Sequence, residues 1–292
     1  MEEIEINITD LIVQTLNTLF QNLFSSIDNS LYFVLDDMVF IDSSVISDSY
    51  FEKLLGTSSS NGILLIVNSL LIGFLLYYCI NLFVSNFTLT QVQRPYQFLF
   101  KFALIIIFIN SSYFLCEKII SFNSILSLSI RNIGETIFNK NICFSSLITE
   151  INSILYIENP SFDIFSLDGI IKSLSSVSLF NLIFSYSLRY IMIKVFILLS
   201  PFAILSFLLP STSWFFKTWL QGFLSLLFIQ ILISIILLII FSLCLSENIF
   251  SKFMYVGSLY ALLRANTYVK ELIGGISTEV QSNFSNFNFS GK

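Results

Sequence analysis

Residues 195–246 read VFILLSPFAILSFLLPSTSWFFKTWLQGFLSLLFIQILISIILLIIFSLCLS, and Lys217 is the only charged residue among them. Twenty-two uncharged residues precede this lysine and 29 follow it. A helix needs about 20 apolar residues to cross the hydrocarbon core of a bilayer, which is about 30 Å thick. The stretch is therefore long enough for two consecutive membrane-spanning helices, joined by a basic turn at residues 210–219.

The composition of the whole chain agrees with a membrane protein. Apolar residues make up 55% and charged residues 11%, and the mean hydropathy is +0.84, whereas soluble domains carry about 25% charged residues. The chain has no histidine, which is the commonest metal ligand and general base near neutral pH. Its four cysteines show no metal-type spacing. We expect an all-α, polytopic membrane protein that is not an enzyme and holds no cofactor or metal.

The N-terminal region, residues 1–61, is acidic and amphipathic. It holds ten of the 19 acidic side chains and one base, Lys53, and its acidic start predicts no cleaved signal peptide. Apolar residues recur at helical spacing at Ile8, Ile12, Leu16, Leu19, Leu23 and Ile27. They predict a helix of about 20 residues that lies in the membrane interface or packs against copies of itself or a partner. The lack of Lys and Arg favours protein contacts. A second apolar piece, 31–41, is interrupted by Asp36 and Asp37 and is not predicted to span.

Two spans and a polar domain are predicted next. After a glycine-bounded hinge at 56–62, residues 63–83 and 96–116 form a transmembrane hairpin, domain 62–116. Residues 117–178 carry six acids and four bases. We expect them to form a polar domain outside the bilayer, with short amphipathic helices around 119–130 and 148–157.

The third span begins the Pro-kinked hairpin, domain 179–246. Pro201 removes a helix hydrogen bond and is expected to kink the span. Lys194 lies seven residues before it and shares its helix face. Carbonyl groups freed by the kink need partners within the protein or in a wet cavity. Either Arg189, Lys194 and Pro201 line a lumen or a subunit seam, or Lys194 reaches outward to the headgroups.

The fourth span, about 220–243, carries polar residues suited to helix packing. These are Gln221, Ser225, Gln230 and Ser234. Gln230 and Ser234 are one turn apart, so both can hydrogen-bond to a neighbouring helix. A short fifth span at 250–263 and a cytoplasmic tail complete the domain 247–292.

The lysines and arginines predict the orientation. With five spans, the short turns and the tail place six bases on one side and Lys252 alone on the other. The six are Arg94, Lys101, Lys217, Arg264, Lys270 and Lys292. Cytoplasmic loops are enriched in such residues. We therefore expect a multi-pass plasma-membrane protein with a cytoplasmic C-terminus and with the N-terminal region and 117–178 outside.

The turn in the second hairpin resembles a known signature. The residues are Pro201-Phe-Ala-Ile, followed by Pro210-Ser-Thr-Ser-Trp-Phe-Phe-Lys-Thr-Trp219-Leu. They are similar to the TrbL-like mating-channel family, the polytopic inner-membrane subunit of type IV secretion and conjugative transfer machines. There a helix ends in a proline, a threonine follows, and a phenylalanine pair and a tryptophan open the next helix. We expect the turn to face the cytoplasm, with Pro210, Thr212, Trp214, Phe215, Phe216, Lys217 and Trp219 as its candidate site residues.

The resemblance is specific over about 180–245 and otherwise one of topology. The chain departs from the family in its modest length, few glycines and short cytoplasmic tail. The resemblance implies a platform that forms a homo-oligomeric ring at the base of a conduit. Its partners would be the lipid bilayer, the secretion ATPase, other membrane subunits of the transfer complex and a stalk or adhesin subunit. Transported DNA or protein would touch it only transiently. Lys217 would contact the ATPase or lipid phosphate, and Trp214 and Trp219 would anchor at headgroup level.

Three other classes remain open. A secondary transporter or permease subunit would use a Pro-broken substrate helix with an inward lysine, although no predicted span contains Asp or Glu to couple cations. A holin-like or toxin pore does not need a 60-residue external domain. A membrane enzyme is the weakest alternative, because a Ser or Cys nucleophile would lack a base.

Overall fold

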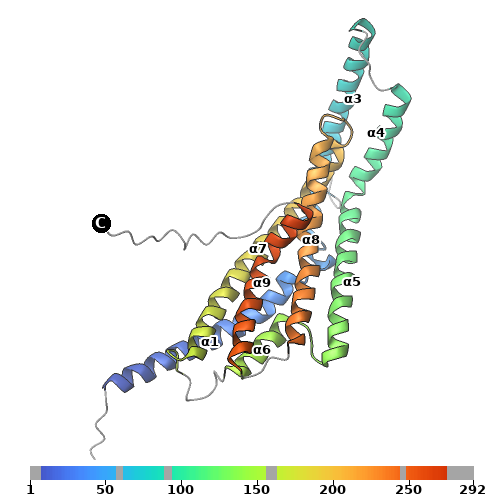
Figure 1. The fold of residues 1–292 in the computed structure, drawn as a ribbon. Coiled ribbons are helices and arrows are strands. Elements are labelled where there is room, and N and C mark those ends of the chain that lie inside the picture. Colours follow the sequence, from blue (N-terminus) through green and yellow to red (C-terminus); the bar gives the residue numbers. More distant parts are fainter. Residues whose placement is uncertain (1–7, 57–61, 89–93, 156–162, 244–247, 275–292) are drawn as a thin grey trace, which may run out of the picture.

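The computed structural model describes residues 8–56, 62–88, 94–155, 163–243 and 248–274. Within these ranges the chain is helical and contains no strand, which confirms the all-α class (Figure 1). The elements are α1 Ile8–Val39, η1 Ser43–Val45, α2 Ser49–Leu55, α3 Ile63–Thr88, α4 Pro95–Asn110, α5 Ser112–Phe138, α6 Phe144–Ile154, α7 Leu167–Ser206, α8 Ser213–Ser242 and α9 Ile249–Ile273. Most of the predicted hinge at 56–62 and the tail from 275 onward lie outside the described residues.

Four of these helices are long and apolar enough to cross a membrane, so the chain is a multi-pass membrane protein. They are α3, α5, α7 and α8, and α4 is a shorter apolar helix. The set differs from the predicted one at two places. The predicted second span is divided between α4 and α5, and α9 is not among the candidate spans in the described part of the chain.

The break between α4 and α5 has a local cause. The Asn110 side chain donates to Ile106 O at 2.9 Å, and the Ser111 hydroxyl donates to Ile107 O at 2.7 Å. Such side-chain bonds to the preceding turn compete with the helical ladder. α5 then continues to Phe138, through the boundary expected at 116/117. α7 likewise begins before the boundary expected at 178/179. The predicted polar domain, residues 117–178, is thus joined to the spans on both sides by continuous helices.

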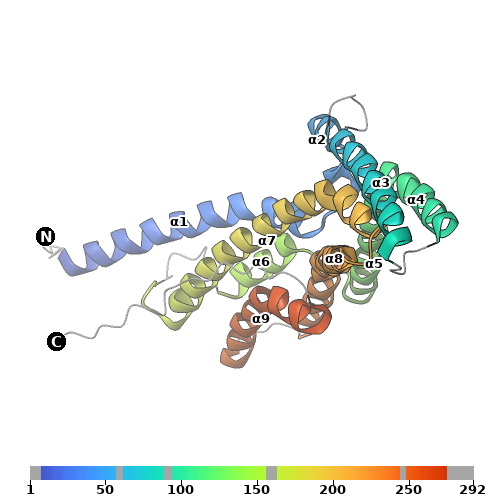
Figure 2. The ribbon, with the colours of Figure 1, turned by 90° about the horizontal axis from the view of Figure 1, so that it is seen from above.

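α1 is one helix of 32 residues, so the separate apolar piece expected at 31–41 is instead its last part. Its N-terminal half extends away from the other helices (Figure 2). There Asn17 Oδ1 accepts a hydrogen bond from the backbone N–H of Ile164. Its C-terminal half packs against α6 and α7.

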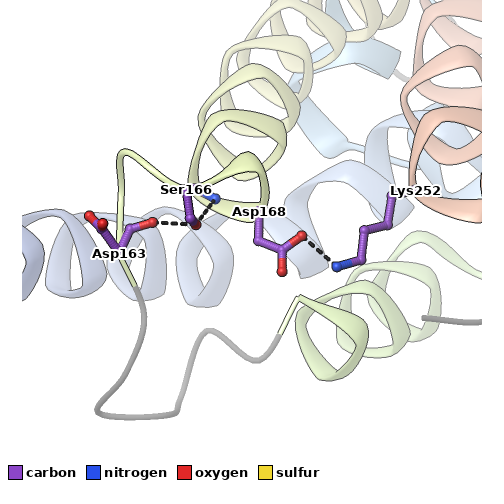
Figure 3. Close-up of polar contacts among 5 residues, drawn as sticks. Asp163, Ser166, Asp168 and Lys252 are labelled. Atoms are coloured by element: carbon purple, nitrogen blue, oxygen red, sulfur yellow. Dashed lines mark hydrogen bonds and ion pairs between the residues drawn. The ribbon is translucent and has the colours of Figure 1, made fainter. Parts of the chain in front are cut away.

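α7 is the longest helix, with 40 residues. At 1.5 Å per residue it measures about 60 Å, twice the hydrocarbon thickness, so one end lies beyond the hydrocarbon. The Ser166 hydroxyl caps its start by accepting from the Gly169 N–H at 3.2 Å. Asp168 in its first turn forms an ion pair with Lys252 of α9 (Figure 3). Near the other end, Pro201 cannot donate to Ile197 O, and the Ser200 hydroxyl does so instead at 2.7 Å.

The buried apolar side chains of the described residues form two clusters. The main core draws on α1 and α5 to α9. The smaller one, called here the α3–α4 cluster, contains Leu64, Val67, Leu71, Tyr78, Phe98, Ile105, Ile109, Ile204, Leu205 and Leu208. In the α3–α4 cluster, the rings of Tyr78 and Phe98 stack 3.6 Å apart. The end of α7 is therefore shared between a hairpin of two apolar helices and the main core.

Candidate functional site

Arg189 of α7 lies at the centre of the main core and is fully buried. Its Nε donates to Leu226 O of α8 at 2.7 Å, and its Nη1 donates to Val39 O of α1 at 3.0 Å. Val39 is the last residue of α1, where a helix dipole presents its negative end. One guanidinium group therefore fixes the end of α1 to the crossing of α7 and α8.

This arginine has carbonyl groups rather than a carboxylate as partners. Among the described residues, no Asp or Glu lies within ion-pair distance of it, and its Nη2 has no hydrogen-bond partner. A buried charge without a counter-ion is costly to retain. Arg189 thus meets the criterion for a functional candidate, because ionisable residues within spanning helices are rare and face the protein interior.

Asp36, in the last turn of α1, holds the start of α6. Its two carboxylate oxygens accept from the backbone N–H groups of Phe144 and Ser145 at 2.9 and 3.2 Å. Burial raises the pKa of this carboxyl above its ordinary value of 3.8, although the two N–H groups and the charge of Arg131 act in the opposite direction. The carboxylate serves as an N-terminal cap supplied by another helix.

Arg131 of α5 also contacts the residues at the end of α1 and before the start of α6. Its Nε donates to Ile142 O at 2.7 Å, and its guanidinium carbon lies 4.0 Å from the centre of the Phe40 ring. We call Asp36, Val39, Phe40, Arg131 and Arg189 the α1 joint. Four long helices and α6 meet at or next to these five residues.

An open hollow of about 540 Å³ lies beside the α1 joint. It is lined by Val34, Asp37, Met38, Phe40, Ile41, Asp42, Ser44, Val45 and Tyr190. Asp37 and Asp42 give it a negative charge, but no group of three possible metal ligands occurs in the described part of the chain. The hollow therefore carries no metal site built from those residues.

Polar side chains also connect the long helices in pairs. Between α5 and α8, the Asn123 amide donates to Gln230 Oε1 at 3.3 Å, and the Ser127 and Ser234 hydroxyls lie 2.7 Å apart. Between α7 and α9, the Tyr186 hydroxyl donates to Leu262 O at 2.9 Å, and the Asn266 amide donates to Ser185 Oγ at 2.6 Å. All but Leu262 contribute buried side-chain polar groups, so these bonds specify which helices are neighbours.

The three residues predicted to line a lumen or a seam do not gather in one place. Arg189 and Pro201 are buried within the single chain. Lys194 is half-buried, and its Nζ lies 5.2 Å from the ring centre of Tyr190 and 5.9 Å from that of Phe51. Lys194 thus faces aromatic rings of α7 and α2.

The polar residues predicted on the fourth span have separate roles. Gln230 and Ser234 hydrogen-bond to α5, as described above. Ser225 is buried, while the exposed Gln221 donates to Ile273 O and so caps the end of α9.

The signature region forms a short turn and the start of α8. Pro210 is exposed, and the Thr212 hydroxyl donates to Ser206 O at 2.7 Å, which closes the end of α7. Because α8 begins at Ser213, the expected turn at 210–219 is largely helical. Trp214 and Lys217 of this segment are exposed, and Phe215 and Phe216 are half-buried.

Trp219 departs from its predicted place. It is buried, and its indole N–H donates to Phe196 O at 2.8 Å. It therefore packs α8 against α7, so its indole N–H binds a neighbouring helix, and its place at headgroup level stays a prediction.

Several residues of the site were not singled out from the sequence. These are Asp36 in its capping role, Asn123, Ser127 and Arg131. Most of them bind a group far away in the sequence, as when Asn123 of α5 donates to Gln230 of α8, 107 residues further on. Lys101 is predicted as a base on the cytoplasmic side, without its partner, and it donates to Leu208 O at 3.0 Å. A local pattern carries no signal for such partners.

Comparison with protein-family models, with curated proteins and with solved structures finds no match to this chain.

Proposed function

We propose that the chain is a non-catalytic channel or platform subunit of a type IV secretion machine, which assembles as a ring at the base of the conduit. The resemblance of residues 201–219 motivates the proposal. The geometry adds support of a different kind, because it accounts for the polar residues of the membrane helices and leaves one surface suited to self-association.

The polar groups of the long helices act within the chain. Arg189 binds two carbonyl groups, and Gln230 and Ser234 bind α5. Lys194, the candidate substrate lysine of a transporter, stacks against two aromatic rings. These contacts weigh against the alternative of a secondary transporter or permease, which needs polar groups that face a substrate cavity.

An exposed apolar stripe on α1 carries the proposal. Ile12, Leu19 and Leu23 are each at least half-exposed, and Leu16 lies between them on the same face. Their spacing of four, three and four residues is that of a coiled-coil seam. Because this half of α1 projects from the bundle (Figure 2), a sister chain can cover the stripe without displacing any other helix.

The arrangement of the helix ends supports the proposed orientation, with a cytoplasmic C-terminus. Gln221 at the start of α8 binds the end of α9, whereas Lys252 at the start of α9 binds Asp168 at the start of α7. The α7–α8 turn and the end of α9 therefore lie at one end of the bundle. Lys217, Arg264 and Lys270 then fall toward the side that the lysine and arginine count assigns to the cytoplasm.

The test is extraction of the native complex from its host membrane in a mild detergent, with the mass and the composition measured. We expect a multimer that contains a secretion ATPase. The double variant Leu19→Lys, Leu23→Lys should give a complex of smaller mass, because it places two charges in the apolar seam. The matched control Gln14→Lys, Ser25→Lys adds the same charge to exposed positions on the opposite face of α1 and should keep the wild-type mass.

A strictly monomeric wild-type chain, or a complex that contains no transfer component, would overturn the proposal. Reporters test the orientation separately. A cytoplasm-dependent reporter should be active after Lys292 and inactive near Asn141, and the reverse result would contradict the orientation.

A further inference from the structure

A second cavity, distinct from the α1 joint, lies where α4 meets α5. It has a volume of about 270 Å³, and its walls come from α4, α5 and the turn end of the α7–α8 hairpin. The lining residues are Ile105, Phe108, Ser112, Leu115, Cys116, Ile119, Ile204, Phe207, Phe216, Trp219 and Leu220. The break in the helix at Ser111 thus coincides with a hollow in the membrane part of the molecule.

The lining fits a hydrocarbon ligand that also carries a hydrogen-bond acceptor. Apart from Ser112 and Cys116 its side chains are aliphatic or aromatic, and an apolar cavity of this kind stays free of water. Ser112 is 1% exposed, and within the described residues its hydroxyl has no hydrogen-bond partner. A buried hydroxyl group is normally hydrogen-bonded, so an occupant with an acceptor would satisfy it.

The mouth of the cavity opens on the apolar surface of the candidate spans. Phe108 of α4 and Phe207, which directly follows α7, are 47% and 46% exposed, while the inner residues Ser112 and Cys116 are buried. The walls belong to three candidate spans and to the apolar helix α4. We therefore expect lipid rather than water next to the opening.

The ammonium group of Lys101 lies beside this opening. The Nζ of Lys101 lies 4.9 Å from the ring centre of Phe207 and donates to Leu208 O at 3.0 Å. An ammonium group carries three N–H donors, and this hydrogen bond uses one of them. A positive charge next to an apolar slot matches a molecule with a negative head and a hydrocarbon tail.

We propose that this cavity is a binding site for one membrane phospholipid. The acyl chain fills the apolar slot, the ester carbonyl accepts from Ser112, and the phosphate binds the Lys101 ammonium. The site does not depend on the secretion function proposed above, since it rests on residues of α4, α5 and the α7–α8 hairpin alone.

The experiment uses the full chain in lipid nanodiscs with a phosphatidylglycerol that carries a photoreactive diazirine in one acyl chain. After illumination, mass spectrometry locates the labelled residues. We expect the label to concentrate on the lining residues of α5 and α8, such as Ile119 and Leu220. Leu115→Trp fills the slot and should remove most of this label. Phe114→Trp, at an exposed position next to it, should leave the label unchanged.

Lys101→Gln tests the headgroup contact. It should lower labelling by the phosphatidylglycerol probe and leave labelling by a diazirine diacylglycerol with the same chains unchanged. An equal fall with both probes would overturn the assignment of the phosphate to Lys101.

Thermal unfolding and gel filtration show whether each variant folds. If Leu115→Trp does not fold, the wild-type cavity can be probed at Cys116 in a variant with the other three cysteines replaced by serine. Added phosphatidylglycerol should slow the reaction of Cys116 with an apolar maleimide. Label spread evenly over exposed apolar residues such as Phe122, unchanged label in a folded Leu115→Trp variant, or cross-links to a second copy of the chain would each overturn the proposal.

Discussion

The α3–α4 cluster and the main core are both buried among membrane helices, yet they are packed differently. In the α3–α4 cluster, Tyr78 stacks on Phe98, and the polar contact between α3 and α4 among the described residues is a 3.5 Å approach of Asn68 to Asn110. In the main core, Arg189 and the Asn123–Gln230 pair are buried and bound to neighbouring helices. The most apolar window of α3 is 22% buried, against 56% for that of α8.

This difference indicates where the fold is specified. Apolar helix surfaces gain little by leaving lipid for each other, so packing and interhelical hydrogen bonds determine which helices associate. The main core has both close packing and interhelical hydrogen bonds. The α3–α4 cluster relies on packing and exposes most of α3, so we expect it to be the less stable of the two regions.

The largest expected effect is that of replacing Arg189, which joins α1 to α7 and α8 in the main core. Arg189→Ala leaves a cavity and leaves the buried carbonyl groups of Leu226 and Val39 without their donor, and we expect a loss of about 3 kcal/mol in the free energy of unfolding. Thermal unfolding in detergent measures this, and hydrogen exchange should rise first around Val39. Leu71→Ala in the α3–α4 cluster is the matched truncation and should cost less. Equal losses would contradict the contrast between the two regions.

Alanine substitutions at two glycines compare the packing of the two regions directly. A Cβ atom at Gly222 would come within 2.7 Å of the buried Phe196 ring, whereas a Cβ atom at Gly73 in α3 would meet nothing within 4 Å. Gly222→Ala should therefore lose about 1–2 kcal/mol of stability through overpacking. Gly73→Ala should be neutral or stabilising, because alanine favours a helix over glycine. A destabilised Gly73→Ala variant would mean that α3 is as closely packed as α8.

A double-mutant cycle on Asn123 and Gln230 measures what one buried polar pair contributes. We expect a coupling energy of about 0.6 kcal/mol, the average for such pairs in membrane proteins. The variants Asn123→Leu, Gln230→Leu and their combination are compared by unfolding in detergent, and the double variant should lose less than the sum of the single losses. Strict additivity would show that the pair does not join α5 to α8.

The smallest expected effect concerns the pH dependence at Asp36. Burial raises the pKa of this carboxyl in the folded state, so the folded chain binds its proton more tightly than the unfolded chain does. The contribution of Asp36 to stability is then complete below pH 3.8 and declines as the pH rises through the raised pKa. Asp36→Asn should remove this decline from the pH profile of unfolding. The control Asp37→Asn, at an exposed neighbour, should retain it.

The hydropathy of the sequence predicts the long helices α3, α7 and α8, but not the course of α5. In α5 the polar Asn123 and Ser127 are buried against α8, while Phe122 and Ile125 are exposed. In a membrane helix the apolar side chains can face lipid while the polar ones face other helices. A spanning segment of mixed composition therefore resembles a polar, water-soluble domain in sequence. This is why the boundary predicted at 116/117 falls inside a helix.

Of the site, the sequence predicts Arg189 as a candidate lining residue of a lumen or a subunit seam, and Gln230 and Ser234 as residues suited to contacts with a neighbouring helix. It does not predict the partners. Val39 is 150 residues from Arg189, and Phe144 is 108 residues from Asp36. Such pairings depend on how the helices are arranged in space, and spacing along one helix does not encode that arrangement.

The position of Arg189 also has a consequence for biosynthesis. An arginine at the centre of a helix costs about 2.5–3.5 kcal/mol when that helix is inserted alone by the translocon. Val39 is translated before Arg189, whereas Leu226 follows 37 residues after it. α7 therefore reaches the bilayer with one acceptor for its guanidinium group already made and the other still to come. We therefore expect stable insertion of α7 to require α8, so that the α7–α8 hairpin enters the membrane as one unit.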